Sequence, residues 1–221
     1  MTRPVLNLEV GAPTRPDEAH ELRLDVRERR SRAAPEHPLP RGAKVIGVVA
    51  LVFSALYFLS DAIEMIQGGF SGPQLWLTFV AEAAVPIFVV GLAVVQRPHL
   101  GRLGECSALA YAYSYVFFTG TVVYALINST EDYATLSNRL GPVMIVHGAV
   151  MLIAGLGFGY AVLRARLLPA WSARTLMVGV VLVAVAQGLP EGVQLTAAFV
   201  RDLAFAGMAV ALLRTLRLPA D

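Results

Sequence analysis

Hydrophobic positions beyond residue 43 fall into six long runs, separated by short polar breaks. Each run has roughly 20 residues, the length that an α-helix needs to cross a hydrocarbon layer about 30 Å thick. The pattern therefore predicts an all-α integral membrane protein whose transmembrane domain covers residues 43–216. The six predicted transmembrane helices are 44–66, 75–96, 106–127, 141–163, 173–190 and 197–214.

The composition agrees with this pattern, because 56% of the residues are hydrophobic and only 15% are charged. Residues 1–42 differ from the rest, with eight Arg, seven Asp or Glu and six of the 13 prolines. Such a segment buries too little apolar surface to offset the entropy of ordering it. We therefore expect 1–42 to be a disordered cytoplasmic tail and 217–221 a short cytoplasmic C-terminus. No motif indicates a nucleic-acid partner.

Basic residues predict the orientation, because Lys and Arg resist translocation and mark the cytoplasmic side of a membrane. With the N-terminus inside, all but two of the 18 basic residues lie on the cytoplasmic side, the exceptions being Arg139 and Arg201. Both termini are therefore predicted to be cytoplasmic. Arg outnumbers Lys 17 to 1, which indicates a GC-rich bacterial genome and hence the bacterial inner membrane. The lipid bilayer is the expected partner, while a homo-oligomer or a second membrane protein remains open.

Two segments 120 residues apart resemble each other. Residues 67–92 and 187–212, compared without gaps, are identical at ten of 26 positions. Apolar identities mean little in such a sequence, but two of the ten are glutamine pairs, and the chain has only five glutamines. We therefore predict a parallel internal repeat that relates the first two helices to the last two, within three helical hairpins. The glutamine pairs are Gln67 with Gln187 and Gln74 with Gln194.

Each copy of the repeat carries an acid, Glu82 in the first and Asp202 in the second. Both acids are about eight residues into their helices, ~12 Å below the outer end. A carboxylate at this depth costs roughly 2.5–3.5 kcal/mol on insertion scales, so both should face the bundle interior. Pro86 also leaves the carbonyl of Glu82 without a helical N–H partner. Arg201 points about 100° away from Asp202 on the helix, so we expect it to pair with an acid on another helix.

Other polar residues gather toward the same outer side. Asp61 and Glu64 lie near the end of the first helix, and His147 lies about two turns into the fourth. Gln187 and Glu191 are predicted one turn apart at the end of the fifth. Acids outnumber bases in this layer, which favours a cation, a proton or an amine-bearing ligand over an anion. The predicted ligand- or ion-binding residues are Glu82, Asp202, Asp61, Glu64, His147, Gln187, Glu191 and Arg201.

An acidic, outward-facing cavity of this kind leaves three classes of function open. The favoured class is a small cation- or proton-coupled transporter, because parallel repeats and polar sites within helices are common in transporter folds. A membrane sensor or accessory subunit would use the same cavity without transport. A membrane-embedded hydrolase, the least favoured class, would use His147 and a carboxylate, with or without a metal.

The sequence assigns no catalytic residue and predicts no cofactor. A single intramembrane histidine argues against a bis-histidine haem. The single lysine, Lys44, lies at the membrane boundary, which argues against a retinal Schiff base. The glycine-rich run at 155–159 lies within an apolar helix with no preceding strand, so we interpret it as a helix-packing surface rather than a nucleotide loop.

Overall fold

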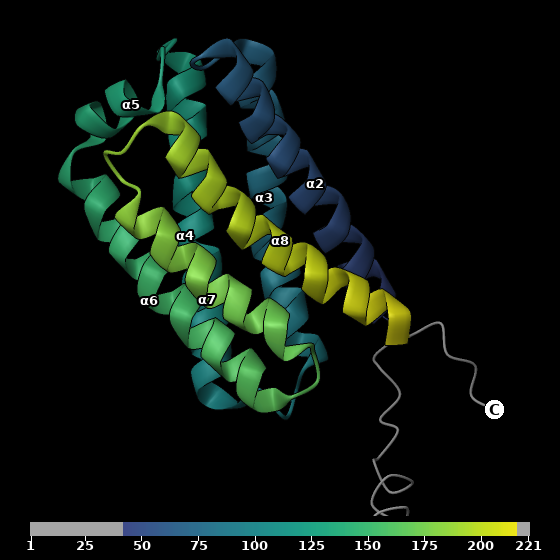
Figure 1. The fold of residues 1–221 in the computed structure, drawn as a ribbon. Helices are drawn as coiled ribbons and strands as arrows, with labels where there is room; N and C mark the ends of the chain where they lie inside the picture. The colour runs from purple at the N-terminus through teal and green to yellow at the C-terminus, as the bar shows by residue number, and fades with distance from the viewer. Residues whose placement is uncertain (1–41, 216–221) are drawn as a thin grey trace, which may run out of the picture. The chain divides into compact units, whose positions relative to one another are not determined.

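A computed structural model describes residues 42–215, apart from the side chains of Glu191 and Thr215. Within these bounds the chain is helical and contains no strand, so the all-α prediction is confirmed there. The predicted tail up to residue 41 and the C-terminal segment 217–221 lie outside the described residues. The helices are α2 (Ala43–Gln67), α3 (Gly72–Val95), α4 (Gly101–Ile127), α5 (Tyr133–Leu140), α6 (Pro142–Ala165), α7 (Ala170–Val185) and α8 (Glu191–Thr215) (Figure 1).

Five of these helices are long and apolar enough to cross a membrane: α2, α3, α4, α6 and α8. Helix α7 is also apolar but has only 16 residues. Large aliphatic side chains cover the outer faces of the bundle, and Ile66, Ile127 and Ile153 are 82%, 78% and 72% exposed. An exposed apolar surface of this kind is unfavourable in water and favourable against lipid chains. The architecture is that of an α-helical membrane protein.

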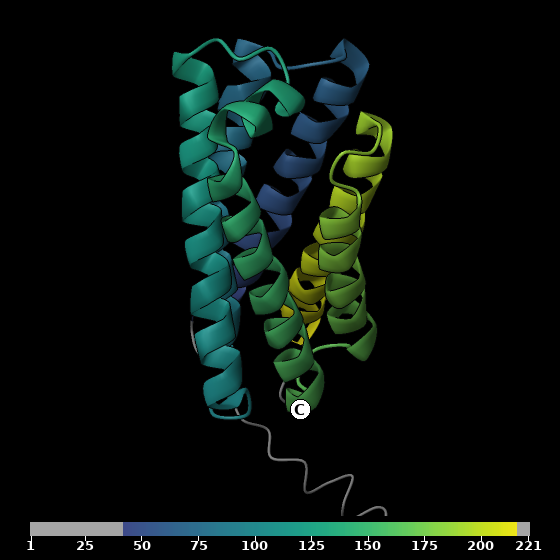
Figure 2. The same ribbon diagram turned by 90° about the vertical axis from the view of Figure 1, so that its left-hand side faces the viewer.

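The long helices and α7 form a closed ring. Each packs against the next one along the chain, and α8 packs against α2 to complete the circle. Short connections explain this order, since they place consecutive helices side by side in opposite directions. The predicted helix pairs α2/α3, α4/α6 and α7/α8 do pack together, as consecutive parts of one ring. Figure 2 shows α5 crossing the end of the bundle between α4 and α6.

The last two predicted helices have different bounds in the structure. The run predicted at 173–190 ends as a helix at Val185, and the run predicted at 197–214 begins at Glu191. Gly188 lies between them with φ of 79°, a left-handed conformation that favours glycine and ends regular helix. The prediction carried the first run past this glycine to residue 190 and so placed the break too late in the chain.

Gln187 and Glu191 are consequently not neighbours on one helix, and that prediction is wrong. Gln187 lies in the connection after α7, whereas Glu191 is the first residue of α8. Pro190 precedes Glu191 and, having no N–H, suits the start of a helix but not its interior. The side chain of Glu191 lies outside the described part of the structure.

Helix α5 was not predicted, because residues 128–140 are mostly polar and suggest a loop. The Asp132 side chain accepts a hydrogen bond from the backbone N–H of Thr135 at 2.7 Å, which caps the first turn of α5. Gly141, with φ of 53°, ends the helix. The signal in the sequence is this Asp-x-x-Thr spacing followed by a glycine, rather than any apolar period.

Large buried side chains fill the ring toward the end opposite α5. The rings of Phe88 and Phe205 meet at 5.2 Å, and the ring of Tyr111 lies 6.2 Å from Phe205 and 5.3 Å from Tyr115. Phe158 is fully buried in the same cluster. This aromatic core closes the interior below the level of the polar residues described next.

Candidate functional site

A cavity of about 840 Å³ lies within the ring at the end where α5 lies. Exposed residues line it at that end, including Asn138, Gln187 and Leu189, so the cavity opens there. Tyr57, Glu82 and Arg201 line its inner part. Glu82 and Arg201 are each ten residues past the start of their helix, and Tyr57 is ten residues before the end of α2. At 1.5 Å per residue the three side chains share a level ~15 Å inside the bundle.

Five of the eight predicted binding residues line this cavity, and Asp202 adjoins it through its bond to Arg201. His147 does not line it, and the side chain of Glu191 is not described. The depth argument for the acids holds, since Glu82 is 6% and Asp202 is 4% exposed. The five lining residues are Asp61, Glu64, Glu82, Gln187 and Arg201.

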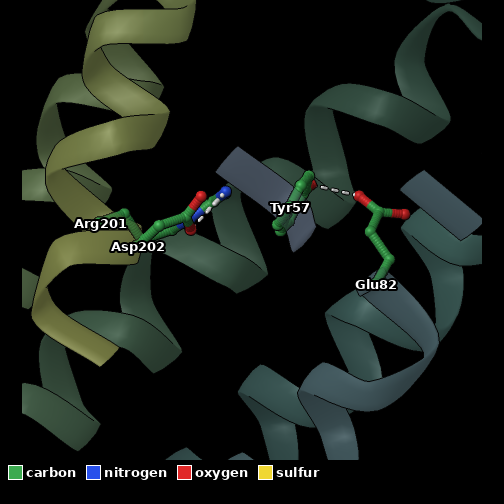
Figure 3. A network of polar contacts seen from close by, with 4 residues as sticks. All are labelled: Tyr57, Glu82, Arg201 and Asp202. Carbon is green, nitrogen blue, oxygen red and sulfur yellow. Dashed lines mark hydrogen bonds and ion pairs between the residues drawn. The ribbon is translucent and has the colours of Figure 1, made fainter. Parts of the chain in front are cut away.

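Within the described part of the chain, only one of the two carboxylate oxygens of Glu82 takes part in a hydrogen bond. The Tyr57 hydroxyl donates a hydrogen bond to Glu82 Oε1 at 2.5 Å (Figure 3). Glu82 Oε2 has no hydrogen-bond partner among the residues that the structure describes. A buried acceptor left in this way is costly, so the site can still accept a donor from a bound molecule.

Arg201 pairs with Asp202, its own neighbour on α8. Arg201 Nε donates to Asp202 Oδ1 at 3.1 Å, and Nη2 lies 3.1 Å from the same oxygen. The prediction that Arg201 pairs with an acid on another helix is therefore wrong. The long arginine side chain bends back along the helix surface, which overcomes the 100° separation of the two Cβ directions.

Two aromatic rings hold the guanidinium in place. Arg201 Cζ lies 4.9 Å from the ring centroid of Tyr57 on α2 and 5.7 Å from that of Tyr115 on α4. Cation–π contacts of this kind stabilise a buried cation, more so where water is excluded. In this part of the chain Arg201 Nη2 and Asp202 Oδ2 are both buried and lack a hydrogen-bond partner. The pair thus retains unused hydrogen-bonding capacity.

Tyr57 connects the two charged groups. Figure 3 shows its side chain between the Arg201–Asp202 pair and Glu82, with the hydroxyl directed at Glu82. The sequence prediction missed Tyr57, because a tyrosine in an apolar run usually packs against other side chains. The available signal is its spacing: Tyr57 lies four residues before Asp61 and seven before Glu64, on one face of α2.

A second polar cluster joins α2 to α3 nearer the open end. Gln74 Nε2 lies 3.0 Å from Glu64 Oε2, 3.0 Å from Thr78 Oγ1 and 3.2 Å from Ser60 Oγ. Hydrogen bonds between polar side chains commonly join membrane helices in this way. At the matching position of the predicted repeat, Gln194 instead donates to the backbone oxygen of Leu189 at 2.8 Å. The glutamine pair therefore makes different bonds in the two copies.

Helix α5 is tied to the connections on both sides of the cavity. The Tyr133 hydroxyl donates to Gln187 Oε1 at 3.2 Å, and the N–H of Phe70 donates to the Glu131 carbonyl at 2.7 Å. Loss of hydration at Tyr133 raises the pKa of its phenol, so the hydroxyl stays protonated and can donate at neutral pH. The bond from the Thr135 N–H lowers the pKa of Asp132 below its ordinary value.

His147 does not project into the interior, so the prediction that it joins the acids is wrong. Its Nε2 lies 3.2 Å from the Tyr113 hydroxyl, and its ring stacks on Phe117 at 3.6 Å. Tyr113 is itself exposed, which places the group on the outer side of α4 and α6. On α6 the cavity is lined instead by Met144 and Gly148, among others.

This placement removes the basis of the hydrolase alternative, which required His147 within reach of an acid or a metal. Within residues 42–215 no three His, Cys, Asp or Glu side chains are grouped to hold a metal ion. Comparisons of the chain with protein-family models, with curated proteins and with solved structures found no match. The function is therefore inferred from the fold and from the chemistry of the cavity.

Proposed function

We propose that this chain is a multi-pass membrane protein that binds a small amine-bearing solute in the cavity and transports it, coupled to a cation or proton. The observation that carries this proposal is that Glu82 lines the cavity and that its buried carboxylate oxygen Oε2 has no hydrogen-bond partner in the described region. An ammonium group supplies both the positive charge and the N–H donors that such an oxygen requires.

The charge balance of the lining supports a positively charged group. Asp61, Glu64 and Glu82 line the α2/α3 side, while the charge of Arg201 is already compensated by Asp202. Aliphatic and aromatic residues make up most of the remaining wall, including Leu136, Met151 and Val180. A cavity with a few directed polar groups and an apolar remainder suits an organic amine better than a bare ion.

We further propose six membrane spans, with α7 as the fifth, in the bacterial inner membrane with both termini cytoplasmic. Apart from Arg139 and Arg201, the basic residues between 42 and 215 lie at the bundle end opposite α5, which is the distribution expected of a cytoplasmic side. The cavity then opens to the outside. These basic residues are Lys44, Arg97, Arg102, Arg164, Arg166, Arg174 and Arg214.

A sensor or accessory subunit is the second candidate, and one specific feature favours it. The aromatic core around Phe88, Phe205, Tyr111 and Tyr115 closes the ring directly below Arg201. A transporter needs a second state in which this core separates and the cavity opens to the other side. A receptor needs no such state, because ligand binding alone would alter the packing of α2, α3 and α8.

Ligand binding can be tested with the purified full-length protein and a series of primary alkylamines from methylamine to hexylamine. We expect amines to raise the melting temperature of the wild type and of Glu105→Gln, and to have little effect on Glu82→Gln. Glu105 is the matched control, since it pairs with Arg97 at the far end of the bundle. If amines stabilise none of the three proteins, or all three equally, the proposal fails.

Transport is tested separately by counterflow in proteoliposomes loaded with an amine that binds. Exchange of labelled amine that responds to an imposed sodium or proton gradient supports the transporter. Binding without any exchange in either direction supports the sensor or accessory subunit instead.

A further inference from the structure

The inner part of the cavity carries two opposite charges, one on either side of Tyr57. Glu82 extends from α3 and Arg201 from α8, and both line the cavity while being only 6% and 4% exposed. Figure 3 shows the Tyr57 side chain between them. A solute that enters this part of the cavity therefore meets an acidic group and a basic group at one depth.

Both groups have unused hydrogen-bonding capacity. Glu82 Oε2 and Arg201 Nη2 are buried and, among the described residues, neither has a hydrogen-bond partner. Although Nη2 lies 3.1 Å from Asp202 Oδ1, only Nε has the direction needed to donate to that oxygen. Glu82 thus offers an acceptor and Arg201 a donor, while Asp202 Oδ2 beside Arg201 is likewise buried without a partner in the described region.

The two groups are held at a fixed separation. Tyr57 donates to Glu82 through its hydroxyl and lies against the Arg201 guanidinium through its ring, 4.9 Å from Cζ. Helix α7 packs closely against the backbone of Arg201, since a Cβ atom at Gly179 would come 2.7 Å from the Arg201 Cα and N atoms. Side chains fixed in this way bind a matching ligand without first losing conformational freedom.

We propose that the solute is amphoteric, with an ammonium group bound by Glu82 and a carboxylate bound by Arg201, joined by an apolar spacer that lies along Tyr57. This inference rests on the proposed function and narrows its substrate class from amines to amino acids with separated charges. An α-amino acid carries its ammonium and carboxylate groups on the same carbon. The two groups are then too close together to reach both sides of a tyrosine side chain. An ω-amino acid with several methylene groups meets the geometry.

The test compares ω-amino acids from glycine to 7-aminoheptanoate with the alkylamine and the fatty acid of the same chain length. Affinities are measured by calorimetry on the purified full-length protein. We expect the best ω-amino acid to have an intermediate length and to bind at least tenfold more tightly than its matched amine and its matched acid. Equal affinity for the amino acid and its matched amine would overturn the amphoteric assignment and leave the proposed function standing. An optimum at glycine would overturn it as well.

Two sets of variants assign the two ends of the solute. In Glu82→Gln the ω-amino acid should no longer bind more tightly than the matched fatty acid. In the double variant Arg201→Gln/Asp202→Asn the ω-amino acid should no longer bind more tightly than the matched amine, while the amine itself should still bind. Arg201→Lys keeps the charge but loses the planar guanidinium, so it provides a second test with a smaller expected loss. If no compound of the three series binds to the wild type, both this inference and the proposed function are wrong.

Discussion

The guanidinium of Arg201 lies 4.9 Å from the ring of Tyr57, so a residue of the last helix rests on a residue of the first long helix. The hydroxyl of the same tyrosine donates a hydrogen bond to Glu82. One side chain therefore joins α2, α3 and α8 at the level where the cavity ends. Changes at Tyr57 should affect both the packing of these helices and the chemistry of the site.

Replacing the Tyr57 hydroxyl alone should destabilise the protein. In Tyr57→Phe the ring remains against Arg201, but Glu82 loses its donor, and a buried acceptor left unpaired costs about 1–3 kcal/mol. Equilibrium unfolding in detergent measures the change. Tyr113→Phe is the matched control, because its hydroxyl lies on the outer side near His147, and we expect a change within about 0.5 kcal/mol. Equal effects of the two substitutions would contradict the role of Tyr57.

The two acids of the predicted repeat should respond differently to conversion to amides. Asp202→Asn removes the charge that compensates Arg201 and should cost about 3–5 kcal/mol, as breaking a buried ion pair does. Glu82→Gln should cost much less, because the amide oxygen still accepts the hydrogen bond from the Tyr57 hydroxyl. Melting temperatures of both variants decide this. A Glu82→Gln protein that is as unstable as Asp202→Asn would show that Glu82 also compensates Arg201.

Gly179 should not tolerate a larger residue. In Gly179→Ala the new methyl group would meet the backbone of Arg201 at 2.7 Å, and backbone cannot move aside as a flexible side chain can. We expect a loss of about 1–3 kcal/mol, the usual effect of overpacking. At Gly120 a Cβ atom meets nothing within 4 Å, so Gly120→Ala should be neutral or slightly stabilising. Unfolding free energies of the two variants provide the comparison.

The cap at Asp132 predicts a pH dependence confined to α5. Its pKa is lowered in the folded protein, chiefly by the bond from the Thr135 N–H, so its contribution is present above the unfolded pKa. This contribution is lost as the pH falls through the lowered, folded-state pKa. Asp132→Ala should weaken the cap by about 0.5–2 kcal/mol at neutral pH. Hydrogen exchange should then be faster in α5 and unchanged in α3, and the variant should no longer respond to acid there.

The proposed topology predicts the side of the membrane on which each connection lies. Reporters inserted at residues 70 and 130 should be active outside the cell, and reporters at both termini should be active inside. A C-terminal reporter found outside would show that one apolar helix does not cross, and α7, with 16 residues, is the first to suspect.

Much of the fold follows from the sequence, because membrane-length apolar runs are a strong signal for helices. The burial of Glu82 and Asp202 also follows, since an exposed carboxylate in lipid is costly. The sequence does not determine which face of a helix points inward when every face is apolar. The outward position of His147 on α6 therefore could not be predicted. The partner of Arg201 depends on side-chain flexibility, and α5 depends on one capping bond, neither of which leaves a periodic pattern.

The closed ring has a consequence for the order of assembly during synthesis. Because α8 packs against α2, the ring of helices can close only after α8 has been synthesised. Tyr57 on α2 can contact Arg201 only once α8 has joined the ring. Asp202 lies beside Arg201 on the same helix, so the ion pair that compensates the arginine is contained within α8 and needs no acid from another helix.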